Sequence, residues 1–579
     1  MTNNARIIRI GVLYQGGYLR SWESQALRAI SLLANTSLEV LIEVDTRNGK
    51  AVQPAQAGSL LWQRYLKWFY KPSALLQTTT TRDFALDIPK LTCTPRQQGA
   101  GVELDEAIVA AISGYQLDFI LSFADQTVNT LVAKLTKSNI WYFQFGAQRN
   151  KPNLPIGFWE TCTHKIVTPA MLCQLASSGA TTVLKQGYFR TLLHSLSLSA
   201  TTIYTECANW PTDICRQLLA GGELPSLALQ PLPAASEVQL PSNAATLRFL
   251  GGLVRQKIQQ LYNIYLQADQ WNMGVVNRPI QDFLRPETLR GVRVDAPELP
   301  SRNVFYADCF ARQEESGTVV YFEAYDYRVR RGNISRLSYP WQQGSTPELV
   351  LDFPFHLSYP FLFGPYCIPE GWVSNSIRMY DLRKPVTDPA AGQLLLEAPA
   401  VDSTLLEYDG RYWLFYTRMD RDPMLNLYIS YAVSLEGPWH EHPQNPVKTD
   451  IRSARPAGPF FEEAGKLYRP AQDCAKDYGY GITINEVLTL TTTEYAEREA
   501  AALTSPHPDY PDGLHTITAV DATHTIIDFK RRRFIPFASL LAIWIWVSGF
   551  IQFKKKPRKT EVAAPSPAVP EAKTANSVH

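Results

Sequence analysis

A loose internal repeat in the second half of the chain constrains its fold more than any other feature. A polar motif followed by a strand rich in Phe and Tyr recurs, with marker residues at Asp308, Ser358, Ser403, Arg455 and His515. The markers are 50, 45, 52 and 60 residues apart. A period of about 40–50 residues with several short strands per unit is typical of propeller blades. The sequence therefore predicts an all-β five-bladed propeller, whose marker residues converge at one end of the central channel.

The repeat units carry carboxylate, guanidinium and imidazole side chains. Paired carboxylates at a channel mouth can act as acid and base on a glycosidic bond, and arginines can clamp a phosphate or carboxylate of a ligand. The alternative is structural, with carboxylates as turn caps and arginines locking neighbouring blades. The candidate residues are Asp308, His356, Glu370, Asp402, Arg452, Arg455, Arg469, Asp473 and His515.

The first 220 residues follow a different pattern. Arg6–Tyr14 reads as a buried strand, Ser21–Leu33 has helical spacing and Leu38–Val44 reads as a second strand, an order that predicts a parallel α/β sheet. Gly16-Gly17 lies at the first turn without a GxGxxG or P-loop pattern, which favours a tight turn over a phosphate site. The amphipathic segment Leu60–Tyr70 fits a membrane-surface helix or, the favoured interpretation, a helix that packs between domains.

The end of the chain is both hydrophobic and basic. Ile535–Phe553 has no charged residue over 19 residues, about the length that a helix needs to span a bilayer. A helix in the membrane interface and a helix that covers a protein groove are the alternatives. From Lys530 onward there are ten Lys/Arg and two Asp/Glu, whereas the preceding residues carry a net charge of −6. Because the basic character belongs to one segment, we expect no nucleic-acid partner.

Compartment and domain boundaries follow from the remaining features. Met1–Gly17 lacks the apolar region of a signal peptide, so we expect a membrane protein with the bulk of the chain in the cytoplasm. The eight cysteines form no CxxC pair, which indicates buried thiols rather than a zinc site.

Glu223–Thr246 is rich in Pro, Ser and Ala, a composition that is typical of a linker. The predicted parts are an α/β domain (1–220), a linker (221–246), the propeller (247–533), a transmembrane helix (534–553) and a disordered basic tail (554–579).

The second half of the chain resembles a known family. The strings FHLSYPFLF, DGRYWLFYT, DIRSARPAG and LYRPAQD resemble the five-bladed propeller of glucosamine inositolphosphorylceramide transferases. That propeller is similar to those of family 43 glycoside hydrolases, which use three carboxylates. The resemblance implies Asp308 as a catalytic base, and Glu370 and Asp402 as the next catalytic carboxylates in order. The remaining candidates are expected to bind substrate: His356, Arg452, Arg455, Arg469, Asp473 and His515.

The first half resembles the formyltransferase fold, in which a Rossmann-like half binds a formyl-folate. The matching string is Ile140–Glu160, where working formyltransferases supply an Asn and a His. Tyr142 and Gln144 take those positions here, Ala147 stands where relatives have Asp, and His164 lies in an expected exposed turn. Gln144 cannot act as a general base, so the resemblance implies a degenerate domain. The cofactor would be 10-formyltetrahydrofolate only if this domain is active.

Three functions stay open from the sequence. The first is a membrane-tethered carbohydrate-active or carbohydrate-binding protein of glycan or glycolipid metabolism, with a saccharide or glycolipid ligand. The second is a sugar N-formyltransferase. The third is a non-catalytic scaffold that holds a partner glycosyltransferase at the bilayer. Carboxylates around an open channel mouth would favour the first function, and a mouth plugged by side chains would favour the third.

Overall fold

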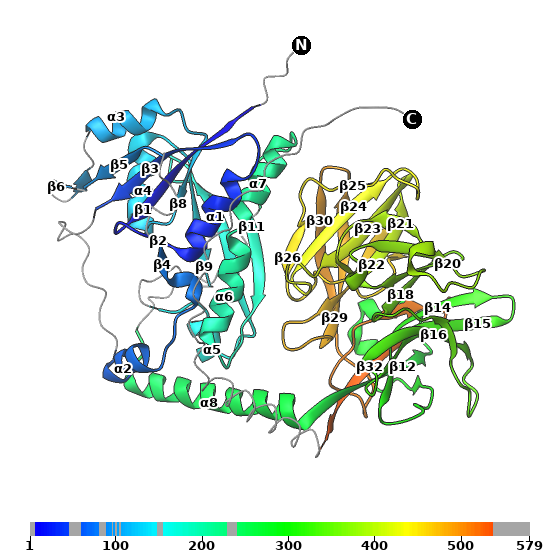
Figure 1. Cartoon of the computed structure of the whole chain (residues 1–579). Coiled ribbons are helices and arrows are strands. Elements are labelled where there is room, and N and C mark those ends of the chain that lie inside the picture. The colour runs from blue at the N-terminus through cyan, green and yellow to red at the C-terminus, as the bar shows by residue number, and fades with distance from the viewer. Residues whose placement is uncertain are drawn as a thin grey trace, which may run out of the picture.

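The computed structural model describes residues 6–45, 59–79, 88–94, 96–98, 101–103, 106–146, 154–227 and 240–535 (Figure 1). An α/β unit at the N-terminal end lies beside a β-rich unit, and a long helix runs along one edge of the molecule between them (Figure 1). The predicted α/β region and the propeller-like region are both confirmed.

The α/β unit is built on a mostly parallel sheet. Strands β5, β3, β1, β8 and β9 pair in parallel in that order, and β10 and β11 continue the sheet in antiparallel pairing. The strands are β1 (Ile8–Gln15), β3 (Thr36–Val44), β5 (Lys90–Cys93), β8 (Phe119–Ser122), β9 (Ile140–Phe145), β10 (Val167–Leu175) and β11 (Thr181–Arg190). Two small ribbons accompany them, β2 (Leu19–Arg20) with β4 (Thr78–Thr79) and β6 (Arg96–Gln98) with β7 (Gly101–Glu103).

Helices cover both faces of this sheet, which explains the unbroken apolar run of β1. Ile10 and Val12 belong to one buried cluster with α1 and α6, whereas Leu13 belongs to another with α3 and α4. The helices are α1 (Ser21–Ser31), α2 (Leu60–Trp68), α3 (Glu106–Gly114), α4 (Gln126–Thr136), α5 (Phe158–Cys162), α6 (Leu196–Cys207), α7 (Trp210–Leu219) and α8 (Asn243–Leu266). The α2 segment packs on α8 and α5, as the domain-packing interpretation expected.

The β-rich unit contains four separate four-stranded sheets. One of them joins β12, near the start of this region, to β32 at its end. The strands of the four sheets are β12 (Gln267–Val276), β13 (Val294–Asp295), β31 (Ile517–Ala519) and β32 (Thr525–Phe534); β14 (Val304–Glu314), β15 (Gly317–Asp326), β16 (Arg331–Tyr339) and β17 (Glu348–Leu351); β18 (Ser358–Phe363), β19 (Tyr366–Glu370), β20 (Ile377–Asp381) and β21 (Gln393–Leu396); β27 (Phe461–Glu463), β28 (Lys466–Asp473), β29 (Gly481–Leu490) and β30 (Tyr495–Leu503).

The prediction of five separate blades needs a correction. Strands β22 (Ala400–Tyr408), β23 (Arg411–Arg418), β24 (Asn426–Ala432) and β25 (His440–Glu441) pair in sequence. They do not form a sheet of their own, because β26 (Lys448–Asp450) pairs with β24 on one side and with β11 on the other. One twelve-stranded sheet therefore runs from the α/β unit into the propeller-like unit, and four separate blades remain.

Side chains reinforce this shared sheet. Glu206 on α6 is buried, forms an ion pair with Arg421, and accepts a hydrogen bond of 2.9 Å from Asn426 Nδ2. The Arg452 guanidinium lies 4.1 Å from the centre of the Tyr188 ring. The two units are therefore joined by backbone pairing, a buried ion pair and a cation–π contact.

The ends of the predicted domains differ from the structure in two places. Helix α8 occupies Asn243–Leu266, where the end of the linker and the start of the propeller were expected, and the first strand of the propeller-like unit begins at Gln267. Phe534, the first residue of the expected transmembrane helix, is the last residue of β32. Residues 536–579 lie outside the described part of the chain. Within the described part, no helix has the length and apolar character needed to cross a bilayer.

Candidate functional site

Three inner strands of the propeller-like unit share a local irregularity that turns side chains toward a common centre. The pairing register shifts in β14 after Ala307, in β18 after Ser358 and in β22 after Val401. At each shift one residue adopts a positive φ, namely Asp308 (53°), Tyr359 (43°) and Asp402 (50°). Such bulges re-aim side chains and are frequent beside functional sites. Three of the five repeat markers, Asp308, Ser358 and Ser403, therefore lie at or beside a repeated backbone bulge.

The first half of the site is an ion-pair group around Arg455. Arg455 Nε donates to Asp402 Oδ2 at 2.5 Å, and Arg455 Nη2 lies 3.7 Å from Glu370 Oε2. Gln472 Nε2 donates to the same Asp402 oxygen at 2.6 Å. The Tyr478 ring lies 5.1 Å from the Arg455 guanidinium. One buried cation thus lies between two carboxyl groups from different sheets.

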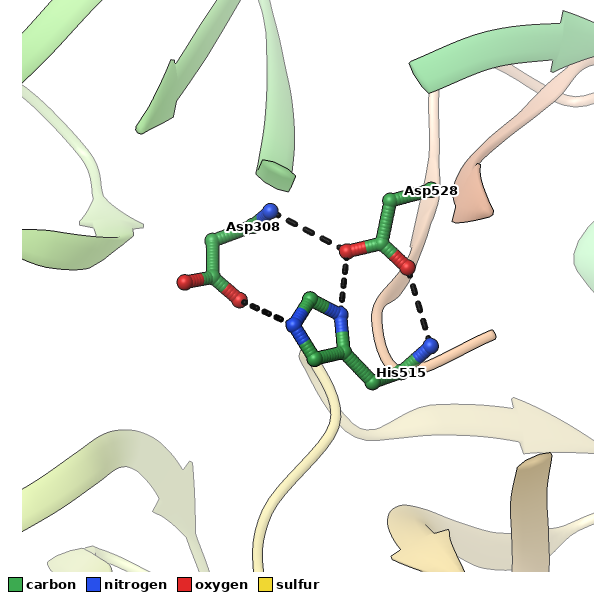
Figure 2. A group of neighbouring side chains, drawn as sticks. All are labelled: Asp308, His515 and Asp528. Atoms are coloured by element: carbon green, nitrogen blue, oxygen red, sulfur yellow. Dashed lines mark hydrogen bonds and ion pairs between the residues drawn. The ribbon is translucent and has the colours of Figure 1, made fainter. Parts of the chain in front are cut away.

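The second half of the site is a chain of Asp308, His515 and Asp528, which Figure 2 shows. His515 Nε2 lies 3.6 Å from Asp308 Oδ1, and His515 Nδ1 contacts the Asp528 carboxylate. Asp528 also accepts the backbone N–H groups of Asp308 at 3.0 Å and of His515 at 2.9 Å. Trp271 stacks on the imidazole with ring centres 3.9 Å apart. The imidazole is therefore fixed in position by two carboxylates and one aromatic ring.

Burial and negative neighbours set the protonation of the carboxyl groups. Burial raises the pKa of Asp308 to about 7, although His515 opposes the shift. Burial, followed by the charge on Asp402, raises the pKa of Glu370 well above its usual range. Burial also raises the pKa of Glu323, which interacts with Asp308 and Glu370. Burial thus favours the neutral form of Glu370, which is the form that a general acid requires, and the pKa of Asp308, about 7, lies near neutral pH.

Asp308, His515 and Asp528 also have the geometry of a possible cation site. One ligand atom from each residue lies within 4.8 Å of the other two, and all three residues are buried. Two carboxylates and an imidazole suit a divalent metal. Burial acts to lower the pKa of the His515 imidazole, but the neighbouring Asp528 and Asp308 outweigh it and raise the pKa, which favours a positive charge beside the two carboxylates.

Five of the nine candidate residues lie together, namely Asp308, Glu370, Asp402, Arg455 and His515. We call these five, together with Glu323 and Asp528, the carboxylate cluster. His356 lies at its edge, with Nε2 3.6 Å from Glu323 Oε1 and a partly exposed ring.

Three candidate residues lie elsewhere and have structural partners. Arg452 pairs with Asp450, at 2.9 Å from Nε to Oδ1, and packs on the α/β unit. Arg469 pairs with Glu497 on β30, at 2.8 Å from Nε to Oε2. Asp473 Oδ1 accepts the backbone N–H of Ala475 at 2.9 Å. All three therefore have partners outside the carboxylate cluster: Arg452 contacts the α/β unit, Arg469 forms an ion pair within one blade, and Asp473 caps a turn.

Two members of the carboxylate cluster were not among the candidate residues that the sequence repeat predicted. Glu323 lies in β15 and Asp528 lies in β32, each inside a run of apolar residues. An acidic residue in the middle of a buried strand is the signal that could have found them, because such a group must be paired or functional.

The cluster is closed to solvent. Asp308, Glu370 and Asp402 are 4%, 8% and 1% exposed. Tyr478 packs against His515 as well as Arg455, with the two ring centres 5.5 Å apart. A saccharide can therefore reach the carboxylates only if covering side chains move.

In the α/β unit, the positions of interest lie on β9 and in a turn. Tyr142 and Gln144 pair in the sheet with Cys173 and Met171 on β10. His164 follows α5 in an exposed turn, as expected. Among the described residues no hydrogen bond joins Gln144 to His164, and Ala147 lies outside them.

Comparison with known proteins places the similarity in the propeller-like unit. Residues 291–508 match the family described as glucosamine inositolphosphorylceramide transferase 1, N-terminal. The chain is 36% identical over 205 residues to glucosamine inositolphosphorylceramide transferase 1 of Oryza sativa subsp. indica, covering 33% of this chain and 27% of that protein. The Arabidopsis thaliana protein of the same name is 34% identical over 216 residues, covering 35% and 28%. The chain thus spans about a quarter of the length of these relatives.

The chain also has low-identity matches among solved structures. A thermostable family-43 glycoside hydrolase has 12% identity and a TM-score of 0.29, covering 38% of this chain and 84% of its own. Phosphoribosylglycinamide formyltransferase from Anaplasma phagocytophilum has 13% identity and a TM-score of 0.24, covering 39% and 96%. The resemblance to the transferase family is confirmed for the matched residues of the propeller-like unit.

The free energy of unfolding should depend on pH through Asp308. Its pKa rises from 3.8 to about 7 on burial, so between these values the folded chain keeps a proton that the unfolded chain releases. The stability linked to this proton is present at low pH and is lost as the pH rises toward 7. Urea titrations across this range should show a smaller fall for Asp308→Asn than for the wild type. Equal slopes for the two chains would contradict the raised pKa.

Proposed function

We propose that the carboxylate cluster binds a saccharide, as a free glycan or as the headgroup of a glycolipid. The observation that carries the proposal is the meeting of Asp308, Glu370, Asp402 and Arg455 at one buried centre from separate parts of the sequence. The similarity to glycolipid-modifying transferases supports a role in carbohydrate or glycolipid metabolism. Glu370 would act as the acid and Asp308 as the base if a glycosidic bond is cleaved or transferred.

Aromatic side chains beside the cluster support a sugar ligand. Tyr325 stacks on Phe305 with ring centres 4.7 Å apart and contacts the His356 ring at 5.9 Å. Trp372, two residues beyond Glu370, is exposed. Aromatic faces suit sugar rings because one side of a sugar is apolar and its hydroxyl groups need polar partners. Gln472 Oε1, buried and without a hydrogen-bond partner in the described part of the chain, could accept such a hydroxyl.

A scaffold function is the second candidate, and the closed centre favours it. The same charges would then only lock the blades together, since buried ion pairs also specify a fold.

In either case we propose that the α/β unit serves as a docking module in which formyl transfer is lost. We also propose that residues 535–553 anchor the protein to a membrane, with its bulk in the cytoplasm. A glycosyltransferase is the proposed partner of the scaffold.

A binding screen separates the two candidates. The full chain is titrated with glycans, nucleotide sugars and sugar-bearing inositol phosphates by calorimetry. Saccharide binding should weaken at least tenfold in Asp308→Asn and Glu370→Gln, because each change removes a charge or a proton donor at the centre. Asp381→Asn, at an ion pair with Arg383 near the surface, is the control and should bind as the wild type does. No binding by the wild type would leave the scaffold function.

A further inference from the structure

Helix α8 has one side packed in the molecule and another side without a partner among the described residues. It runs along the edge of the molecule from α2 to β12 (Figure 1). Phe249 contacts the rings of Trp62 and Phe158, with centres 5.9 Å and 5.0 Å apart. These contacts hold the N-terminal half of the helix against the α/β unit.

The other side of α8 carries an exposed apolar stripe. We define it as Leu247, Val254, Ile258, Leu261 and Tyr262, which are 38–62% exposed. Their spacings of 7, 4, 3 and 1 residues place all five on one side of a helix, within about 100°. Scattered exposed apolar residues are ordinary, but an aligned stripe along a whole helix is typical of an interaction surface.

Basic residues flank the stripe. Arg248 and Arg255 lie on one side of it and Lys257 on the other, as 3.6 residues per turn requires. There is no Asp or Glu anywhere in Asn243–Leu266. The neighbouring helix α2 also lacks acidic residues, and its C-terminal end exposes Trp68. An apolar stripe between cations is the pattern of a helix that lies in the interface of an anionic membrane.

The course of the chain gives an independent reason for a membrane at this edge. The backbone N–H of Ile535 donates to the carbonyl of Leu266 at 3.0 Å, so β32 ends beside the C-terminal end of α8. From there the sequence continues without a charged residue to Phe553. The most hydrophobic segment of the chain therefore starts where the apolar stripe ends.

We propose that the apolar stripe of α8 lies in the surface of an anionic lipid bilayer, with the helix parallel to the membrane. The stripe supplies the buried apolar area, and Arg248, Arg255 and Lys257 contact lipid phosphates. This contact would orient the α/β unit and the propeller-like unit on the bilayer, whether or not residues 535–553 span it. The proposal does not depend on the saccharide site.

Hydrogen–deuterium exchange of the full chain tests the proposal at α8 itself. Exchange is compared in buffer, with vesicles of phosphatidylcholine, and with vesicles that also contain phosphatidylglycerol. We expect at least tenfold slower exchange over residues 247–265 on the anionic vesicles and a smaller effect on the neutral ones. The double variant Val254→Glu with Ile258→Glu should lose this protection even if the tail keeps the chain on the vesicles. Val433→Glu with Leu488→Glu, at exposed positions of the propeller-like unit, should keep it.

Several outcomes would overturn the proposal. Unchanged exchange of α8 on anionic vesicles would show that lipid does not cover the stripe. Additional protection without vesicles that grows with protein concentration would assign the stripe to a second copy of the chain, and protection at every concentration that is lost in the Val254→Glu, Ile258→Glu variant would assign it to the chain's own C-terminal segment. Equal protection on neutral and anionic vesicles would remove the role of the three basic residues. Both double variants change exposed side chains, and circular dichroism confirms that they fold.

Discussion

Arg455→Ala should lower the free energy of unfolding by about 3–5 kcal/mol, the usual cost of removing one partner from a buried ion pair. Arg455 is 8% exposed and is the cation shared by Asp402 and Glu370. Without it, the Asp402 carboxylate loses its guanidinium partner and keeps only hydrogen bonds with Gln472 and Glu370 among the described side chains. The expected result is a large fall in the midpoint of urea unfolding, with an unchanged slope.

The matched control is an arginine whose partner lies at the surface. Arg383 pairs with Asp381 at 2.8 Å, and its side chain is 64% exposed. Arg383→Ala should change the midpoint little, because exposed ion pairs add little to stability. A similar small effect for both variants would mean that Arg455 does not hold the carboxylate cluster together. Arg455→Lys should recover part of the loss, since a lysine keeps the charge but not the fork of donors.

Gly458→Ala should lower the free energy of unfolding by about 3 kcal/mol or more, through overpacking and a disallowed backbone conformation together. Gly458 has a φ of +138°, and an added Cβ would lie 2.0 Å from the carbonyl oxygen of Ile517. The hydrogen bond from Ile517 N–H to the Ala457 carbonyl, at 2.9 Å, holds the two segments close. The alanine must therefore push β31 away from the segment that carries Arg455.

Gly465→Ala separates the clash from the backbone strain. Gly465 also has a positive φ, of +73°, but no atom lies within 4 Å of the added Cβ. Its substitution should cost about 1 kcal/mol, the strain of a left-handed residue alone. Urea unfolding of the two variants gives the difference. Equal losses would show that the approach of Gly458 to Ile517 is not a tight one.

The bulged inner strands explain why the sequence predicted part of the site. Asp308 and Asp402 are repeat markers or adjoin them, and the repeated bulge directs both toward one centre. Arg469 illustrates the limit. Residues three apart on a strand face opposite sides, so Gln472 reaches the cluster while Arg469 on the same strand pairs with Glu497. Composition does not reveal which side of β28 faces the centre.

Contacts between distant segments account for what the sequence did not predict. The β26 strand has three residues, too few for a clear pattern, and its partner β11 lies more than 250 residues earlier in the chain. The fifth blade was expected to be separate because the repeat describes each blade only by its own residues. The pairing between the two units uses the free edges of strands, and no local sequence pattern identifies which edges will pair.

The strand pair between β11 and β26 connects the α/β unit to the carboxylate cluster through only a few residues of chain. Ile451 N–H donates to the Tyr188 carbonyl at 2.9 Å, directly after β26 ends at Asp450. Arg455 follows only four residues later, and Gly458 fixes the far side of that segment against Ile517. A displacement of β11 would therefore reach, within a few residues of chain, the guanidinium that lies between Asp402 and Glu370.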